Sequence, residues 1–293
     1  MSTKTQSGQY GGRKNLTAYV ASLLAPSPLG TTNTETPTYT AQDFSTFDHL
    51  HSRGRAATQE LCEFLSAHPG SNLLDVGCGI GGPARFIAER FVCNVHGIDI
   101  TEEYCHTAEL LNRLCGLDKR IKITPGNALS LPYPDKNFDI VWSQHTSMNI
   151  PDKHTFYSEI HRVLKPGGMF LFHDIFSNEN IPNEEDRALL LPVPWATKPE
   201  HNHLVQGEIV RDILGGLGFH REIWNDLTAE THLWFHNYNA NWTPKDPEQK
   251  SLPKELGPKL FIGDDFKLRA QNLKQNLADK KLTVIQAVFQ RAQ

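Results

Sequence analysis

The sequence predicts an α/β fold in which a largely parallel sheet is covered by helices. Short apolar runs alternate with segments of helical periodicity from residue 72 to about residue 176, and this alternation is typical of a parallel sheet. The segment NLLDVGCGIGGPARFIAERF, residues 72–91, places a glycine-rich turn between the first apolar run and the helix that follows. Such a turn predicts a ligand site at the carboxyl end of the strands.

Each element of the sheet follows from its own apolar run. We expect strands over residues 72–77, 95–99, 121–124, 138–145, 169–175 and 282–290, and a further strand beginning at Phe219. Helical periodicity predicts helices over residues 47–65, 82–91, 102–115, 153–164 and 207–216. The stretch GDDFKLRAQNLKQNLADKK, residues 263–281, predicts an amphipathic helix with a solvated charged face.

Two interruptions of this regular pattern define the domain organisation. Residues 1–45 should form an amphipathic helix and a loop that act as a lid, because residues 26–40 are rich in Pro, Thr and Gly. Residues 46–293 should form one domain with insertions at about residues 177–206 and 228–280. These insertions are too long to be simple loops, so we expect them to be lids as well.

Composition and charge exclude several classes of partner. The formal charge is −4, and the basic residues are scattered, so no basic surface for nucleic acid or an anionic membrane is expected. The apolar run in residues 16–26 is too short to span a membrane. The five cysteines include no Cys-x-x-Cys pair, which predicts reduced thiols in a cytoplasmic protein. A homodimer is left open.

A metal site is not expected, although two His-x-His pairs are present. His49 and His51 fall within the helix expected over residues 47–65, and residues two apart on a helix point away from each other. The second pair is His201 and His203. Cys78 lies inside the glycine turn without a neighbouring cysteine or histidine motif, so it is not expected to be a nucleophile.

The glycine turn satisfies two patterns that imply different cofactors. Gly77, Gly79 and Gly82 match the G-x-G-x-x-G fingerprint of dinucleotide-binding folds. Asp75, however, would repel the pyrophosphate of a dinucleotide from the end of the first strand. A cationic ligand such as S-adenosylmethionine (SAM), which carries an ammonium and a sulfonium but no phosphate, fits this carboxylate better. The D-x-G-x-G-x-G-G pattern therefore favours SAM.

The glycine turn, Asp99, GNALSLPYPDKNFDIVWSQH and EIHRVLKPGGMFLFHD resemble the successive motifs of class I SAM-dependent methyltransferases over about residues 45–175. The stretches FDHLHSRGRAAT, QHTSMNIPDK, LPVPWA and GDDFKLRAQNLKQNL are similar to a subgroup near the ubiquinone/menaquinone-biosynthesis and sarcosine/dimethylglycine methyltransferases. The family resemblance implies a Rossmann-like seven-stranded sheet in the order 3-2-1-4-5-7-6 with the last strand antiparallel. Helices cover both faces of such a sheet, and the stretch LTVIQAVF would be that last strand.

The resemblance also implies roles for residues at the strand ends. Asp75 and the backbone of Gly77, Gly79 and Gly81 should surround the methionine end of SAM, and Asp99 should accept from both ribose hydroxyls. Ile100 should cover one face of the adenine. The residues expected to bind the cofactor are Asp75, Gly77, Cys78, Gly79, Gly81, Asp99, Ile100, Asn127, Ala128 and Gln144.

Asn127 departs from the family pattern, because an aspartate often stands there. An amide oxygen can still accept a hydrogen bond from the adenine amino group. Simpler structural roles remain open for two of these residues, since Asp75 could cap the following turn and Asn127 could serve only as a turn residue.

Catalysis requires a base only where the nucleophile starts protonated, and histidine suits that work near neutral pH. His145 lies just past the fourth strand of the sheet and is the first candidate, while His49 and His51 precede the core. Each of them could instead only shape the pocket.

Trp195 and Trp234 lie in the expected lids and, with His145, are candidates for binding the acceptor. Aromatic lids suit an apolar acceptor or an amine that becomes quaternary, although these rings could equally be core between lid helices. The sequence therefore predicts a SAM-dependent methyltransferase acting on a small molecule at N, O or C. The alternative is a protein that binds SAM without turnover and serves in assembly or regulation.

Overall fold

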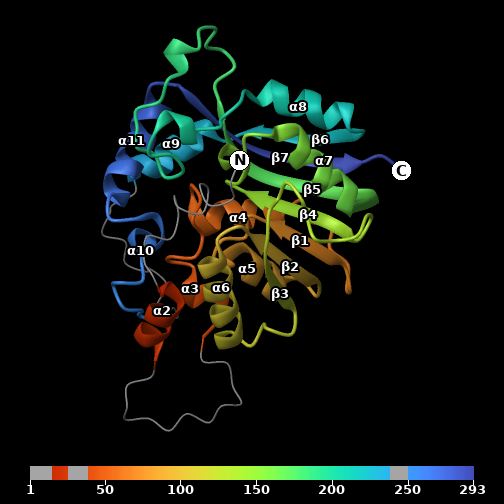
Figure 1. The fold of residues 1–293 in the computed structure, drawn as a ribbon, viewed down its shortest axis with the longest axis vertical. Coiled ribbons are helices and arrows are strands. Elements are labelled where there is room, and N and C mark those ends of the chain that lie inside the picture. The colour runs from red at the N-terminus through yellow and green to blue at the C-terminus, as the bar shows by residue number, and fades with distance from the viewer. Residues whose placement is uncertain (1–14, 26–38, 238–249) are drawn as a thin grey trace.

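The computed structural model describes residues 15–25, 39–237 and 250–293 and contains a seven-stranded sheet in the order β3-β2-β1-β4-β5-β7-β6 (Figure 1). The strands are β1 Asn72–Val76, β2 Asn94–Asp99, β3 Ile121–Pro125, β4 Phe138–Gln144, β5 Leu164–Ser177, β6 Phe219–Asp226 and β7 Leu282–Arg291. Strand β7 is antiparallel to both of its neighbours, and the pairs among β1 to β5 are parallel. The predicted strand order and the antiparallel last strand are thus confirmed.

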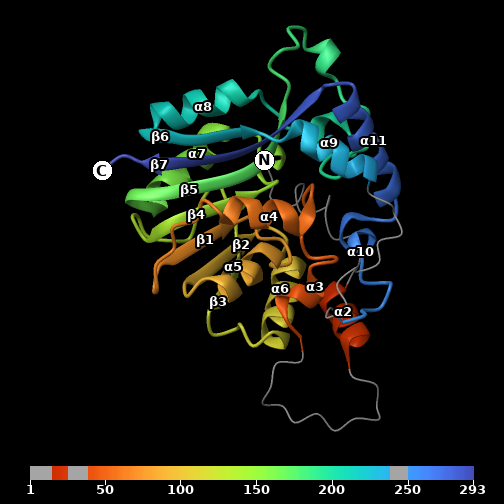
Figure 2. The ribbon, with the colours of Figure 1, turned by 180° about the vertical axis from the view of Figure 1, so that it is seen from behind.

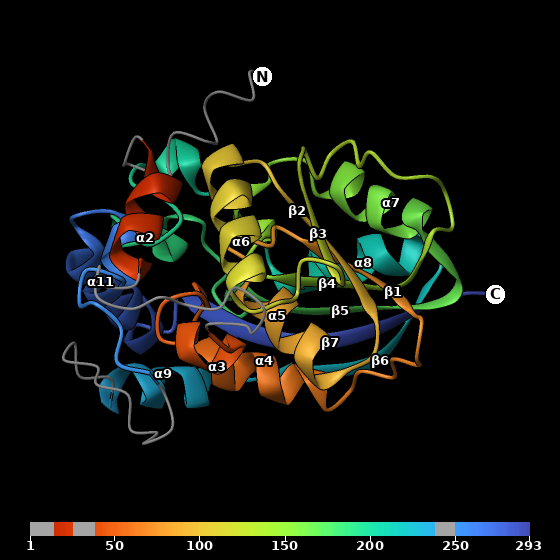
Figure 3. The ribbon, with the colours of Figure 1, turned by 90° about the horizontal axis from the view of Figure 1, so that it is seen from below.

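Two hydrophobic clusters lie on opposite faces of the sheet because successive side chains of a strand alternate between its faces. Leu73 belongs to the cluster beneath α4 (Gly54–Cys62), α5 (Gly82–Arg90) and α6 (Glu102–Leu114). Leu74 belongs to the cluster beneath α7 (Lys153–Val163) and α8 (Gly207–Gly216). Figure 3 shows α7 and α8 on one side of the sheet and α4 and α5 on the other.

The element before the sheet differs from the prediction. Instead of one helix over residues 47–65, the helix α4 covers only Gly54–Cys62, and His49 and His51 lie in irregular backbone ahead of it. Arg53 and Gly54 adopt φ values of 65° and 51°. A right-handed helix does not continue through left-handed backbone, so the helix cannot extend from α4 back to His51. The stretch KPGG, residues 165–168, lies at the start of β5, so this strand begins before the expected residue 169.

The N-terminal helix α2 (Leu16–Leu24) packs against α6 rather than standing apart from the domain. Its buried residues are Leu16, Val20 and Leu24. Thr17 donates its backbone N–H to Glu103 Oε2 over 3.3 Å, and its hydroxyl lies 3.0 Å from that of Thr107. A short helix α3 (Ala41–Phe44) follows. Residues 26–38, most of the expected loop, lie outside the described residues.

The two insertions pack together at one end of the sheet. Figures 1 and 2 show α9 (Thr228–Asn237), α10 (Pro258–Ile262) and α11 (Phe266–Ala278) gathered at the end opposite the C-terminus. The amide of Asn276 on α11 donates to the carbonyl of Leu190 over 2.9 Å, and Asn272 donates to that of Pro192 over 3.0 Å. Opening and closing of these insertions stays a prediction.

Candidate active site

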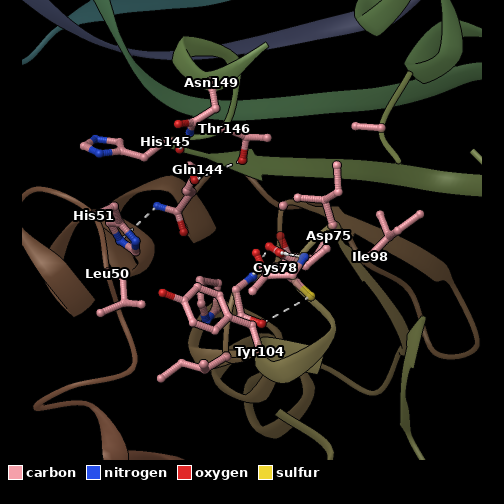
Figure 4. Close-up of a pocket in the computed structure, with 18 of the residues that line it drawn as sticks. Leu50, His51, Asp75, Cys78, Ile98, Tyr104, Gln144, His145, Thr146 and Asn149 are labelled. Carbon is pink, nitrogen blue, oxygen red and sulfur yellow. Dashed lines mark hydrogen bonds between the residues drawn. The ribbon is translucent and has the colours of Figure 1, made fainter. Parts of the chain in front are cut away.

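A cavity lies at the carboxyl edge of the sheet, above β1, β2 and β4 (Figure 4). Its walls come from the glycine turn, the strand ends, the segment before α4, the turn after β4 and both insertions. Most of the residues predicted for the site line this cavity, although they come from separate segments of the chain. They are His51, Asp75, Gly77, Cys78, Gly79, Asp99, Ile100, Asn127, Ala128, Gln144 and His145.

Asp75 is a buried carboxylate at the end of β1. Its side chain faces the cavity beside the glycine turn (Figure 4), the residue is 2 % exposed, and Oδ2 has no hydrogen-bond partner among the described residues. Burial, with the nearby Asp99 carboxylate adding to it, raises the pKa of Asp75 to about 8. An unpaired buried carboxyl is costly unless a ligand satisfies it, so this position calls for a donor, most favourably a cation.

Three glycines of the turn, Gly77, Gly79 and Gly81, have positive φ, and two of them bring the backbone close to the cavity. At Gly77, with φ 77°, a Cβ atom would lie 2.2 Å from Thr146 Oγ1. At Gly79, with φ 54°, a Cβ atom would meet nothing within 4 Å, so the absent side chain leaves open space. Gly81 does not line the cavity, since its Cβ position faces Arg85 Nη1 at 2.9 Å. It therefore has a packing role in the turn, and its cofactor contact stays a prediction.

Asp99 ends β2 next to the glycine turn, and both of its oxygens accept backbone hydrogen bonds. Gly79 N donates to Oδ2 over 2.9 Å, and Thr101 N donates to Oδ1 over 2.8 Å. These bonds lower the pKa of Asp99, but burial is the larger effect and the pKa is raised overall. The Thr101 side chain and the backbone of Ile100 also bond to this carboxyl. These contacts hold the carboxyl group in place on the cavity wall.

Asn127 serves the turn after β3 and also lines the cavity. Its Oδ1 accepts from Leu129 N over 2.9 Å, which makes an Asx turn. The backbone N–H of Gly126 donates to the carbonyl of Asp99 over 2.8 Å and ties this turn to the end of β2. The turn role is therefore present, and the amide remains on the cavity wall.

His49 and His51 lie close together, contrary to the expectation that a helix would separate them. Their ring centroids are 5.6 Å apart because the segment before α4 is irregular. Only His51 lines the cavity, whereas His49 Nδ1 lies 3.0 Å from Thr58 Oγ1. Burial lowers the pKa of each to about 3. Both rings are therefore neutral at physiological pH.

The tautomer of His51 follows from its hydrogen bonds. Its Nε2 lies 3.0 Å from the carbonyl oxygen of Gly54. Because a carbonyl only accepts, Nε2 carries the proton, and Nδ1 is the ring's unprotonated nitrogen. His51 can therefore accept a proton or a hydrogen bond at Nδ1.

Gln144 lies between His51 and the glycine turn (Figure 4). Its Oε1 accepts from the indole N–H of Trp142 over 3.1 Å and from the hydroxyl of Thr58 over 3.0 Å. Its Nε2 lies 3.3 Å from His51 Nε2. An amide nitrogen carries two hydrogens, so at least one of them stays available to a ligand in the cavity.

His145 follows β4 with a φ of 51°, in the left-handed region that only a few non-glycine residues occupy. Its Nε2 lies 2.9 Å from Ser52 Oγ, and its ring stacks on His173 with centroids 5.2 Å apart. Burial, with His173 and His51 adding to it, lowers the pKa of His145 well below its usual range. His145 therefore lines the cavity as a neutral ring, and Ser52 and His173 are partners that the sequence did not reveal.

The two tryptophans considered for acceptor binding do not line the cavity. Trp195 is 1 % exposed, lies in the cluster between the insertions, and donates its Nε1–H to Asn202 over 2.9 Å. Trp234 lies on α9 against the ring of Phe235. The first insertion reaches the cavity through Pro194 instead.

Asp48 also lines the cavity, although no sequence signal pointed to it. Its Oδ2 accepts from the guanidinium of Arg85 over 2.8 Å, and both side chains are buried. A Cβ atom on Gly82 would lie 2.3 Å from the carbonyl of Asp48. Because Gly82 has no side chain, the segment before α4 can pack directly against the glycine turn.

No group of three or more His, Cys, Asp or Glu side chains within the described ranges could hold a metal ion. In the same part of the chain, no helix has both the length and the apolar character needed to cross a membrane.

Comparison with known proteins identifies this fold. Residues 74–172, which contain the glycine turn, Asp99, Asn127 and β4, match the family described as a methyltransferase domain. This part of the chain is therefore similar to methyltransferase domains. The domain's fold is shared with a geranyl diphosphate C-methyltransferase of Streptomyces coelicolor A3(2), with a TM-score of 0.67 over 99 % of this chain and 98 % of that chain at 16 % identity.

Curated relatives of the methyltransferase domain differ in their named substrates. A 24-methylenesterol C-methyltransferase 2 of Oryza sativa subsp. japonica is 36 % identical over 58 % of this chain and 43 % of its own length. A phosphoethanolamine N-methyltransferase 1 of Arabidopsis thaliana is 35 % identical over 45 % of this chain and 26 % of its own length. This chain thus spans less than half the length of these relatives.

Proposed function

We propose that the protein transfers the methyl group of S-adenosylmethionine to a small-molecule acceptor by in-line displacement. The observation that carries this proposal is the unpaired, buried carboxylate of Asp75 beside the glycine turn. A dinucleotide would bring a pyrophosphate to this place, whereas SAM brings an ammonium, which a buried carboxylate favours.

The residues present fit SAM. Asp75 would receive the ammonium, and the open space at Gly79 would receive the methionine chain. Asp99 would accept from the two ribose hydroxyls. Ile100 and Asn127 would border the adenine, together with Ala128 on the same wall. When bound, the cofactor supplies a methyl group activated by a sulfonium.

The protein's own contribution is alignment and exclusion of water. Effective molarities of about 10⁵ to 10⁸ M show how much rate alignment alone supplies. Gln144 and His51 stand on the wall across from Asp75, where an acceptor would be oriented (Figure 4). His51 would take a proton at Nδ1 where the acceptor releases one, and His145 is the second candidate for that role.

Three further proposals concern the protein's setting. The finer resemblance to the ubiquinone/menaquinone-biosynthesis and sarcosine/dimethylglycine methyltransferases supports a common origin with that subgroup. A cytoplasmic location rests on the five cysteines, all of which are buried and free. A homodimer would be tested by light scattering. Silent binding of SAM is less well supported, because the curated relatives named above are methyltransferases.

Calorimetric titration with SAM, S-adenosylhomocysteine and NAD tests the cofactor. We expect binding of the first two and none of NAD. Asp75→Asn removes the charge but keeps the shape of the side chain. It should weaken SAM binding at least about tenfold, as expected for a lost charged hydrogen bond. Asp118→Asn, at an exposed position, is the matched control. Binding of NAD, or equal affinity of wild type and Asp75→Asn for SAM, would overturn the proposal.

A further inference from the structure

Apolar side chains form part of the cavity lining outside the residues predicted for the cofactor. We call five of them the apolar wall: Leu50 before α4, Met148 and Ile150 after β4, Pro194 of the first insertion and Ile262 at the end of α10. Met148, Ile150 and Ile262 are 3 %, 7 % and 8 % exposed. Burying apolar surface of a ligand against such a wall is favourable, whereas a charged group placed there would lose its hydration.

No described residue lining the cavity is a lysine or an arginine. Two buried cations nearby, Arg85 and Lys153, are already engaged. Arg85 donates to Asp48, to the carbonyl of Ile80 and to Asn112. Lys153 donates its ammonium to three backbone carbonyls. A phosphate or carboxylate on the acceptor would therefore meet no lysine or arginine among the described residues that line the cavity.

The histidines do not supply the missing positive charge. Burial lowers the pKa of His51 to about 3 and that of His145 well below its usual range, so both rings are neutral near pH 7. They can exchange neutral hydrogen bonds with a hydroxyl or carbonyl group, as can the amide of Gln144.

A cationic acceptor is no better accommodated. Asp48 is paired with Arg85, and the proposed function uses Asp75 and Asp99 for the cofactor. Among the described lining residues, Tyr104 is the only Phe, Tyr or Trp, and its hydroxyl donates to the carbonyl of Phe261 over 2.7 Å. A cation held by aromatic faces usually needs more than one ring, and the sulfonium of SAM would repel it.

We propose that the acceptor is an uncharged, largely apolar molecule whose reacting end is oriented by neutral hydrogen bonds from His51 and Gln144. This inference rests on the proposed function and narrows it. The relatives are named for a sterol acceptor and for a phosphorylated amine acceptor. The proposed acceptor is chemically closer to the sterol. Within the resembling subgroup, the inference favours a quinol-like phenol over a charged amino acid.

The test uses the full chain saturated with S-adenosylhomocysteine and the neutral apolar fluorophore N-phenyl-1-naphthylamine. We expect its fluorescence to rise on binding and to fall when uncharged sterols or long-chain phenols are added. Millimolar phosphoethanolamine or dimethylglycine should leave it unchanged. No binding of the fluorophore, or its displacement by the charged compounds, would overturn the inference. Failure of S-adenosylhomocysteine to bind would instead overturn the proposed function.

Two variants locate the fluorophore. Ile262→Glu places a carboxylate on the apolar wall and should weaken fluorophore binding at least about tenfold, the cost of burying an unpaired charge, while S-adenosylhomocysteine still binds. Leu233→Glu is the matched control, because Leu233 is 59 % exposed on α9 and does not line the cavity. Met148→Gln provides a milder change should Ile262→Glu fail to fold. Equal fluorophore binding by the wild type and a folded wall variant would contradict the proposed location.

Discussion

At the scale of single residues, the site is defined by polar groups whose charge burial has altered. Asp75 and Asp99 hold carboxyl groups whose pKa values burial raises, while His51 and His145 are rings whose pKa values burial lowers. All four therefore favour their neutral forms in the free protein more than they would in water. A bound cation reverses this preference for the carboxylates and leaves the histidines neutral.

SAM affinity should depend on pH through Asp75. With a pKa of about 8, this carboxyl is mostly protonated below pH 8 in the free protein, and an ammonium binds its ionised form. Ionisation becomes easier as pH rises, so affinity should increase between pH 6 and pH 8. Calorimetry across this range, in buffers of different ionisation enthalpy, should also detect proton release. Asp75→Asn should lack the increase, and a pH-independent affinity in the wild type would refute this account of Asp75.

Methyl transfer at saturating SAM should show no step near pH 6.5. The pKa of His51 is lowered to about 3, so this ring stays neutral from pH 5.5 to pH 7.5 and keeps its Nδ1 acceptor throughout. His51→Ala should reduce turnover by about 10² or more if it accepts a proton, with little change in SAM affinity. His154→Ala, exposed on α7, is the control. A step near pH 6.5 that vanishes in His51→Ala would show that the ring titrates normally.

At the scale of elements, the strands and helices of the sheet could be predicted from periodicity, but the segment that brings the histidines together could not. Apolar runs located β1, β2 and β4 within about two residues, because a buried parallel strand has a continuous apolar signature. The left-handed backbone at Arg53 has no such signature. The stacking of His145 on His173 could not be predicted either, because His173 is a polar residue inside a buried strand.

The sequence also did not predict which residues of the insertions reach the cavity. Their length predicted added structure over the site, yet their aromatic content pointed to Trp195, which packs into the interior instead. Pro194, one residue earlier, reaches the cavity. Composition shows that a segment will be buried, but the side that faces a ligand depends on contacts between segments distant in sequence.

Lys153 holds the turn after β4 against the first insertion. Its ammonium donates to the carbonyls of Ser147, Ile150 and His203 over 2.5 to 2.7 Å, and the residue is 6 % exposed. Lys153→Met should lower the free energy of unfolding by about 3 kcal/mol, because buried carbonyls lose their charged donor. The turn carries Met148, so binding of the fluorophore should weaken as well.

Chemical denaturation measures this effect, with Lys165→Met as the control. Lys165 pairs with Asp139 at a half-exposed site, where an ion pair contributes about 0 to 1 kcal/mol. Equal losses in the two variants would mean that the three carbonyls do not depend on Lys153.

At the scale of the whole molecule, the segment before the sheet is part of the domain rather than an appendage. Helix α2 buries its apolar residues against α6, and Asp48 reaches Arg85 on α5 directly behind the glycine turn. Because Asp48 also lines the cavity, the N-terminal segment, the turn and the site share one set of contacts. A change in the ion pair should therefore affect both stability and cofactor binding.

Breaking this pair should be costly because both charges are buried. Arg85→Met leaves the Asp48 carboxylate without its cation, and we expect the free energy of unfolding to fall by about 3 to 5 kcal/mol. Replacing both partners, as in Arg85→Met with Asp48→Leu, removes the uncompensated charge and should cost less than Arg85→Met alone. Urea denaturation of the single and double variants, with SAM titration beside it, measures both consequences.

Arg90→Met on the same helix is the control, since Arg90 meets Glu63 at the surface with 47 % and 63 % of the side chains exposed. It should change stability by less than about 1 kcal/mol. If the double variant were as unstable as Arg85→Met, the loss would come from the packing of the arginine stem and its bonds to Ile80 and Asn112. The N-terminal segment would then be held by apolar contacts, and cofactor affinity should survive the loss of the ion pair.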